Sequence, residues 1–184
     1  IFMIRIAATL GADAVVAVNA GARIYNVFLA LAAGVNAGTL ALIANAWGAG
    51  QREEAYQRVR LALGLGAALG IVSTVLTWLG APALLGVFGL DAGAYAESLS
   101  YARWLALFFA PMTLYLVLAT SLRAAGDARA PVLFSLLING LSVALAWHWA
   151  KHPPFGMQPH VRFIAIGLGI GNLGGAALAV AAWH

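Results

Sequence analysis

The sequence predicts an all-α fold, a polytopic transmembrane helix bundle, and its composition is the first reason. Of the 184 residues, 63% are hydrophobic and only 9% are charged, whereas soluble domains have roughly 45–50% apolar and about 25% charged residues. The apolar residues also form long segments separated by short polar turns. Because a transmembrane helix needs about 20 mostly apolar residues, the chain has room for about five or six spans and for no separate globular domain.

The first two apolar segments differ greatly in length. Residues 1–10 are too short to cross a bilayer, so we expect them to be the end of a truncated helix. The second segment covers residues 14–47, and at about 1.5 Å per residue it exceeds a hydrocarbon core of roughly 30 Å. We therefore expect this segment to tilt, kink or break, with Gly34 and Gly38 as the hinge.

Proline residues shape the next two predicted spans. The third span covers residues 59–79 and is expected to stop before Pro82, whose ring disfavours helical geometry in the preceding residue. The fourth span covers residues 100–122 and contains Pro111, which removes one backbone hydrogen bond. Pro111 is therefore a further predicted hinge.

Two more spans, residues 132–149 and 163–184, complete the pattern. We assign residues 1–184 to a single transmembrane domain, because no long polar segment divides them. The chain begins at Ile1 rather than at methionine, and we expect it to be a fragment of a longer protein.

The charges in the loops predict which side of the membrane each loop faces. The loops after the second and fourth spans carry five arginines: Arg52, Arg58, Arg60, Arg123 and Arg129. The opposite side carries Lys151 and Arg162, with Arg103 nearby. The positive-inside rule therefore makes the first two loops cytoplasmic. We expect a multi-pass protein of the inner (plasma) membrane, with the lipid bilayer as a partner.

The ionisable residues argue against several classes of function. A net charge of +4 would suggest nucleic-acid binding in a soluble protein, but the basic residues are scattered along apolar segments, so no nucleic-acid partner is expected. His148 and His152 have a metal-ligand spacing but no carboxylate or cysteine beside them, so we interpret them as interface residues and expect no metal. The predicted spans contain no Asp, Glu or Cys, which argues against an enzyme.

Glycines at four-residue spacing are frequent and predict close helix packing in lipid. They are Gly34 and Gly38, Gly66 and Gly70, and the series Gly167, Gly171 and Gly175. Residues 169–174 also match G-x-G-x-x-G by letter, but a dinucleotide site needs a preceding strand and an acidic residue about 20 positions later. We interpret this segment as a glycine-rich helix face and expect no cofactor.

Four short motifs follow one another along the chain. They are LGADAVVAVN at residues 10–19, AWGAG at 46–50, LRAAGDARAP at 122–131 and GGAA at 174–177. As an ordered set they resemble one lobe of the multidrug and toxic compound extrusion (MATE) family, and the resemblance covers essentially the whole chain. It implies one six-helix lobe, the N-terminal one, of a transporter with twelve helices in two lobes.

The resemblance also implies a function. Members of the family are secondary active transporters that export amphipathic, often cationic, organic compounds by antiport with H⁺ or Na⁺ through alternating access. It therefore implies small organic substrates, the second lobe as a partner, and H⁺ or Na⁺ as the coupling ion. Two alternatives stay open: an exporter or flippase of a dedicated lipid-linked or metabolite substrate, and a non-transporting membrane scaffold.

The sequence departs from the family at the two positions associated with ion coupling. The acidic residue of the family's first helix falls in register with Met3. In the fifth helix the family has two asparagines and a carboxylate, where this chain has Asn139, Ser142 and Ala146. The lobe therefore has no carboxylate at either of the family's coupling positions.

Polar residues within the spans are the predicted substrate or ion pathway. Arg23 lies inside the second span with Asn19 and Asn26 on the same helix face, and a charge within the membrane is costly enough to suggest a function. The alternative is that Arg23 extends to the outer surface. Three further polar residues are predicted to line the pathway: Tyr115 in the fourth span, and Asn139 and Ser142 in the fifth. The alternative is that they form hydrogen bonds between helices.

Three charged residues in the cytoplasmic loop before residue 132 form a predicted latch. Arg123, Asp127 and Arg129 could exchange ion-pair partners between two states of the protein. The alternative is a solvated turn whose charges only set the orientation in the membrane.

Overall fold

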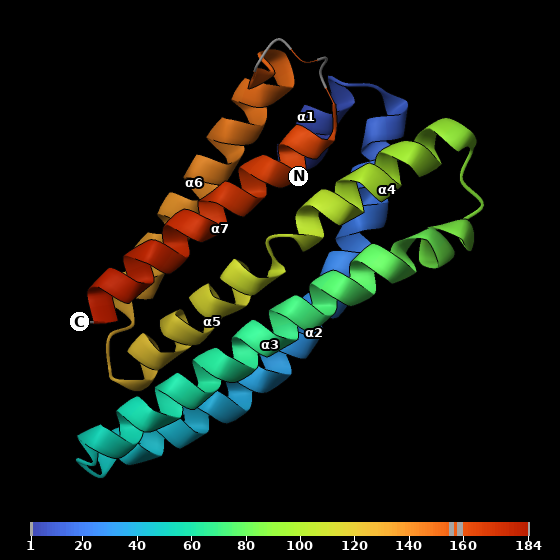
Figure 1. The fold of residues 1–184 in the computed structure, drawn as a ribbon. Helices are drawn as coiled ribbons and strands as arrows, with labels where there is room; N and C mark the ends of the chain where they lie inside the picture. The colour runs from blue at the N-terminus through green and yellow to red at the C-terminus, as the bar shows by residue number, and fades with distance from the viewer. Residues whose placement is uncertain (1, 155–156, 158–159, 184) are drawn as a thin grey trace.

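The structure is a computed structural model that describes residues 2–154, 157 and 160–183. The described residues form seven α-helices and no strand (Figure 1). The helices are α1 (Phe2–Ala8), α2 (Ala12–Gly48), α3 (Arg52–Gly86), α4 (Ala92–Ala106), α5 (Phe109–Ala124), α6 (Arg129–Lys151) and α7 (Arg162–Trp183). The predicted fold class, a transmembrane helix bundle, is confirmed.

Among the described residues, α2, α3, α6 and α7 are each long and apolar enough to cross a membrane. Helices α4 and α5 meet at a bend of 46° and make a fifth span if they are counted together. This agrees with the five predicted spans and the short initial helix. The predicted spans 14–47, 132–149 and 163–184 fall on α2, α6 and α7, and only residue 184 of the last lies outside the described residues.

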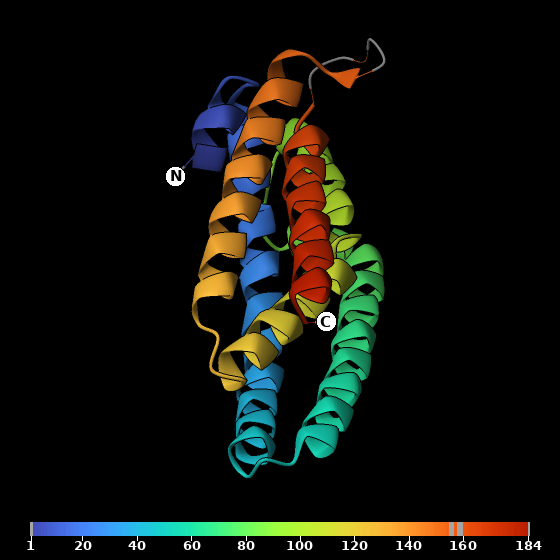
Figure 2. The same cartoon turned by 90° about the vertical axis from the view of Figure 1, so that its left-hand side faces the viewer.

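The helices are arranged as two hairpins with a bent helix pair between them. Figure 1 shows α2 beside α3 on one side, α6 beside α7 on the other, and α4 followed by α5 in the middle. At the centre, the rings of Phe28 in α2 and Phe109 in α5 stack with centroids 4.1 Å apart. In Figure 2 the turn between α2 and α3 projects beyond the ends of α5, α6 and α7. A 37-residue helix such as α2 is longer than the bilayer is thick, so the projection is expected.

The predicted fourth span, residues 100–122, falls on α4 and α5 and is bent as expected, but it is divided into two helices rather than kinked within one. The chain leaves the helix at Leu107 and Phe108, so Pro111 lies in the first turn of α5 rather than inside one helix. A proline ring conflicts with the carbonyl four residues earlier, here that of Leu107, which explains the position of the break. The Thr74 hydroxyl of α3 lies 2.6 Å from the Ala106 carbonyl oxygen and provides a partner at the end of α4.

The predicted end of the third span before Pro82 is wrong, because α3 continues through Pro82 to Gly86. Proline lacks the N–H that would bond the carbonyl oxygen of Trp78 four residues earlier, so α3 loses that one bond. The Tyr95 hydroxyl of α4 donates to the carbonyl oxygen of Pro82 itself at 3.3 Å and so joins α4 to α3 beside the proline. Helix α2 likewise continues without a break through Gly34 and Gly38, and their role as hinges stays a prediction.

Two of the glycine series bring helix backbones together as predicted. A Cβ added at Gly70 of α3 would lie 2.4 Å from the Ala110 Cα of α5, and one at Gly66 would lie 3.1 Å from a methyl group of Val117. The Thr113 hydroxyl of α5 donates to the Gly66 carbonyl oxygen at 2.8 Å. Helix α5 can therefore lie against α3 only because these positions have no side chain.

The second series joins α7 to α6. A Cβ at Gly167 would lie 2.8 Å from the Ala146 nitrogen, and one at Gly171 would meet both Ser142 and the Ile138 carbonyl oxygen of α6. Nothing lies within 4 Å of a Cβ built at Gly34 or Gly38. Gly34 and Gly38 of α2 therefore face open space in this structure, unlike Gly66 and Gly70 of α3 or Gly167 and Gly171 of α7.

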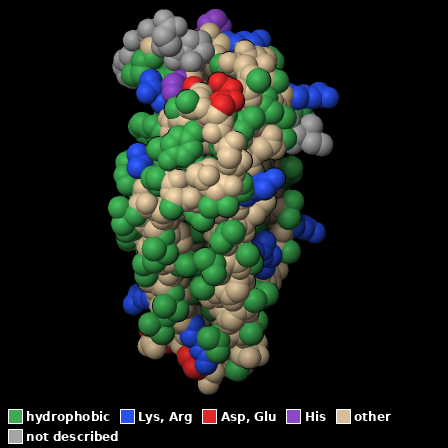
Figure 3. Space-filling view, turned by 90° about the vertical axis from the view of Figure 1, so that its right-hand side faces the viewer, with side chains coloured by type: hydrophobic (Ala, Val, Ile, Leu, Met, Phe, Trp, Pro, Cys, Tyr) green, Lys and Arg blue, Asp and Glu red, His purple; other side chains and the backbone are tan. Residues whose placement is uncertain are grey.

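Among the described residues, the surface between the two ends of the bundle has no acidic side chain on the face shown in Figure 3. Acidic side chains lie near the two ends of that face, while hydrophobic side chains and several Lys or Arg side chains extend over the region between them. Large apolar residues are exposed along α3 and α6: Leu61, Leu65, Leu76, Leu79, Leu133, Leu136 and Leu137. Lipid chains can cover such faces without cost.

We predict that Gly70→Ala destabilises the bundle by about 1–3 kcal/mol, because the added methyl group meets the α5 backbone and neither helix can move away easily. Gly64→Ala is the matched control, since nothing lies within 4 Å of its Cβ in the same helix. Thermal unfolding in detergent, followed by circular dichroism, measures both. Equal melting temperatures for the two variants would contradict the contact between α3 and α5.

Candidate functional site

A cavity of about 270 Å³ lies between helices of the bundle. We call it the central cavity. It is bounded by residues of α1, α2, α4, α5 and α7, and its wall includes Met3, Asn19, Tyr25, Tyr101, Phe108, Phe109, Leu168 and Asn172. The wall is mainly apolar and aromatic with a few polar groups, as in sites that bind small organic molecules.

Two asparagines supply amide groups to the central cavity. Asn19 of α2 donates from Nδ2 to the Val15 carbonyl oxygen at 2.9 Å, and Asn172 of α7 donates in the same way to Leu168. In both, the described hydrogen bond uses the amide nitrogen, which leaves the side-chain oxygen as an acceptor. Sequence reasoning identified Asn19 but missed Asn172, although the glycine-rich segment 169–174 contains it.

The two positions where the MATE family carries coupling carboxylates lie in different surroundings. Met3 of α1 lines the central cavity. Ala146 of α6 is fully buried and packs against Gly167 of α7, where a larger side chain has no space. No Asp or Glu belongs to the wall of the central cavity within the described part of the chain.

Arg23 lies at a second cavity, of about 320 Å³, between α2 and α3. Its guanidinium carbon is 5.3 Å from the centre of the Phe88 ring, which belongs to the turn after α3. Ser73 and Thr77 of α3 add two hydroxyl groups to a wall that is otherwise apolar. The Arg23 side chain is exposed and reaches toward this turn, as a membrane arginine does when it extends to the interface.

The other predicted pathway residues are not brought together. Asn26 of α2 is exposed, and so is Asn139 of α6, whose Nδ2 donates to the Ser135 carbonyl oxygen at 2.7 Å. Tyr115 is buried and its hydroxyl lies 3.4 Å from the Pro131 carbonyl oxygen, which links α5 to α6. Ser142 is buried against α7. Their roles in transport stay predictions, and the geometry of the last two is that of helix packing.

The predicted latch residues have local partners in this structure. Asp127 accepts the backbone N–H groups of Arg129 and Ala130, at 2.9 and 3.1 Å, and so stabilises the start of α6. The Arg123 guanidinium donates to the Thr120 hydroxyl at 3.0 Å. No ion pair joins Arg123 or Arg129 to Asp127 within the described residues, so an exchange of partners stays a prediction.

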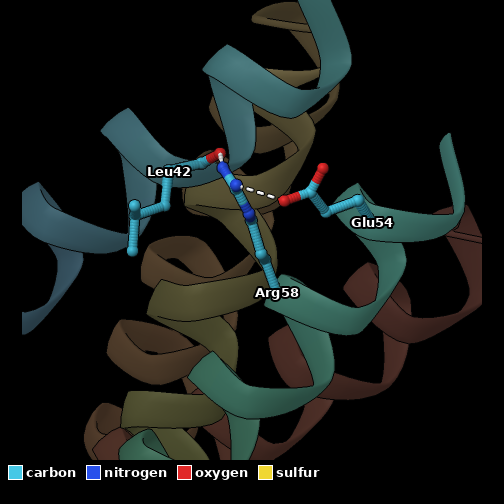
Figure 4. Close-up of polar contacts among 3 residues, drawn as sticks. All are labelled: Leu42, Glu54 and Arg58. Carbon is cyan, nitrogen blue, oxygen red and sulfur yellow. Dashed lines mark hydrogen bonds and ion pairs between the residues drawn. The ribbon is translucent and has the colours of Figure 1, made fainter. Parts of the chain in front are cut away.

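An ion pair that the sequence analysis did not predict lies at the base of the α2–α3 hairpin. Arg58 pairs with Glu54 one turn earlier in α3 at 2.5 Å, and it also donates to the Leu42 carbonyl oxygen of α2 (Figure 4). Glu four residues before Arg is the favourable order on a helix. The pair is partly exposed and adds little stability by itself, but the bond to Leu42 joins the two long helices near their turn.

One side of α2 is rich in exposed small and amide side chains, and Arg23, Val27 and Leu40 are exposed beside them. This stripe of small and amide side chains comprises Ala22, Asn26, Ala30, Ala33, Ala37, Ala41 and Asn45. We call it the small-residue face of α2. The exposed leucines of α3 and α6 differ from it in size, and a purely lipid-facing helix has no need of amides.

Known proteins match this chain over most of its length. The MatE family model matches residues 1–148. The "Probable multidrug resistance protein YoeA" of Bacillus subtilis (strain 168) is 28% identical over 143 residues, which is 78% of this chain and 31% of that protein. The chain thus spans about a third of the curated relative that it matches.

Solved structures agree with the family match. One, the inward-facing conformation of a multidrug resistance MATE family transporter of the MOP superfamily, has a TM-score of 0.88 and 25% identity, and covers 98% of this chain and 41% of its own. A MOP superfamily transporter from Pyrococcus furiosus, described as having a binding pocket of reverse polarity, has a TM-score of 0.86 and shares the fold at 17% identity.

We predict that a cysteine at the central cavity reacts faster with a maleimide than a cysteine buried between two helices. The chain has no native cysteine to interfere. Asn19→Cys lies at the central cavity and should react with a small maleimide, whereas Ser142→Cys is buried between α6 and α7 and should react at least about tenfold more slowly. Mass spectrometry of the membrane-embedded protein measures both rates. Equal rates would show that the cavity is not accessible to water.

Proposed function

This chain belongs to the MatE family of membrane transporters, and from this premise we propose that it forms one lobe of a secondary active transporter. We propose further that the complete protein lies in the inner (plasma) membrane. There it exports amphipathic, often cationic, organic compounds by antiport with H⁺ or Na⁺. The chain corresponds to 41% of the length of a solved transporter, which leaves room for a second lobe.

The small-residue face of α2 is the observation that supports this proposal most. Its alanines allow another helix or a substrate to approach the backbone closely, and its asparagines offer hydrogen bonds. The uncovered Gly34 and Gly38 lie along the same helix. A second lobe, with a cleft between the two lobes, would use such a face, whereas the leucine-rich faces of α3 and α6 suit lipid.

The bend between α4 and α5 provides a physical basis for alternating access. The two helices are separated at Leu107 and Phe108, so α4 can change its angle relative to α5 without breaking further backbone hydrogen bonds. Phe108, at the bend, also lines the central cavity. Occupancy of the cavity would thus favour one of the two arrangements.

The coupling ion is proposed only as H⁺ or Na⁺. With Met3 at the central cavity and Ala146 packed against α7, the family's two coupling carboxylates have no counterpart at these positions. The complete protein would have to supply the acidic group elsewhere. Export of a dedicated lipid-linked compound is a second candidate function, favoured by the apolar cavity between α2 and α3 with Arg23 on its wall.

Efflux of a fluorescent cationic dye from pump-deficient cells that carry the complete gene tests the proposal. We expect efflux that stops when either the proton or the sodium gradient is collapsed, which also identifies the ion. Absence of efflux from cells in which membrane insertion is demonstrated would contradict cation export. It would favour the dedicated-substrate alternative or a non-transporting scaffold.

We predict that Arg23→Ala reduces transport by about tenfold, equivalent to a loss of about 1.4 kcal/mol in binding, with normal membrane insertion. The guanidinium is the only charged group on the wall of the cavity between α2 and α3 among the described residues. Arg103→Ala is the control, since Arg103 packs on Trp78 and does not line that cavity. Unchanged transport in Arg23→Ala would reduce the residue to an anchor at the membrane interface.

A further inference from the structure

Three titratable side chains from separate elements meet at the end of the bundle opposite the α2–α3 turn. Asp13 stands in the first turn of α2, Glu97 in the second turn of α4, and His160 just before α7. They line a cavity of about 360 Å³ that shares no residue with the central cavity. The predicted orientation places this end on the extracytoplasmic side. Sequence reasoning excluded Glu97 from the spans because it expected the fourth span to begin at residue 100.

One nitrogen of His160 faces two groups that need different protonation states. Nδ1 accepts the backbone N–H of Arg162 at 3.2 Å, and it lies 3.5 Å from Oε2 of Glu97. A neutral imidazole with its lone pair on Nδ1 can accept from Arg162 but cannot donate to the carboxylate. With a proton on Nδ1 it can donate to Glu97 but can no longer accept. The two bonds therefore exclude each other.

The surroundings of Glu97 favour the protonated arrangement. Its Oε2 atom is buried and has no hydrogen-bond partner in the described part of the chain, which is unfavourable for a carboxylate oxygen. A proton on His160 would give it a charge-assisted donor. Asp13 adds a second negative charge on the same cavity. Asp13 is itself held against the start of α4, where its Oδ2 lies 2.5 Å from a Cβ built at Gly93.

Two features oppose protonation of His160, so the protonated and neutral arrangements can both be populated. The first turn of α7 begins at Arg162, and a positive charge at a helix N-terminus is unfavourable. The Arg162 guanidinium is also nearby, although it is directed to the Met157 sulfur at 3.3 Å and lies over the Phe163 ring. The backbone N–H that His160 would release is one of the unpaired groups of a helix start, and water can take the place of the imidazole.

We propose that Glu97 and His160 form a proton-binding site in which protonated His160 connects α4 to the start of α7. When the proton leaves, His160 returns to the Arg162 N–H and α4 is released. Val161, next to His160, is fully buried, so the histidine is held on a fixed element while α4 ends at the bend. Because histidine changes charge near neutral pH, the acidity outside the cell would control the angle of α4. Only the consequence for transport depends on the proposed function.

The contact between His160 and Glu97 of α4 can be tested without substrate or an ion gradient. A negative result there is therefore distinct from a negative result in the transport assay. Spin labels on cysteines at Ala96 of α4 and Leu173 of α7, both exposed, report the separation of the helices in the complete protein in nanodiscs. We expect a narrower distribution of distances at about pH 5.5 than at about pH 8. Glu97→Gln should abolish this difference while keeping the size of the side chain, and His152→Gln, an exposed histidine outside the cavity, should preserve it.

Nitrogen-15 spectra of histidine-labelled protein provide an independent measurement that does not depend on the folding of a variant. We expect His160 to carry protons on both nitrogens at the acidic pH and on Nε2 alone at the alkaline pH. A distance distribution that does not change with pH would overturn the proposal. So would a pH response retained in Glu97→Gln, or a proton on Nδ1 of His160 at the alkaline pH.

Discussion

The hydrocarbon of the bilayer offers no hydrogen bonds, and this constraint explains most of the structure. Every backbone N–H and C=O within the membrane must find a partner in the protein, so the chain is helical almost throughout. Side chains of neighbouring helices supply further bonds to backbone carbonyls. Thr74 lies beside the last carbonyl of α4, and Tyr95 binds the carbonyl of Pro82. These two bonds join α3 to α4 near the end of each helix.

Helix association in lipid depends on close packing rather than on exclusion of water. Helix α5 can occupy the centre of the bundle because Gly66 and Gly70 let it approach α3, and α6 meets α7 along Gly167 and Gly171. The same type of residue has a different meaning on α2, where Gly34 and Gly38 touch nothing. Packed glycines hold these helices together, whereas Gly34 and Gly38 make no contact with the described part of the chain.

Polar groups in the lobe are few, and they lie in two separate places along the bundle. The central cavity has two asparagines among aromatic and aliphatic residues, a lining of the kind found in sites for small molecules. The ionisable cluster of Asp13, Glu97 and His160 lies instead at one end of the bundle. Helix α4 connects these two regions, since Glu97 lies near its start and Tyr101, further along, lines the central cavity together with Phe108 at the bend. A change at the end of the bundle would therefore reach the cavity through α4.

The sequence by itself determined the fold class, the number of spans and the family, because hydrophobic length and loop motifs are local properties of the chain. It also indicated Asn19 as a candidate, since an amide within an apolar span is visible without any structure; the structure places Asn19 at the central cavity, and its role in a pathway stays a prediction. Only the tertiary structure decided that Ser142 is buried against α7, that the chain breaks before Pro111, and that Glu97 and His160, 63 positions apart in sequence, lie together. These outcomes depend on which helix lies beside which, and neither residue periodicity nor a local motif contains that information.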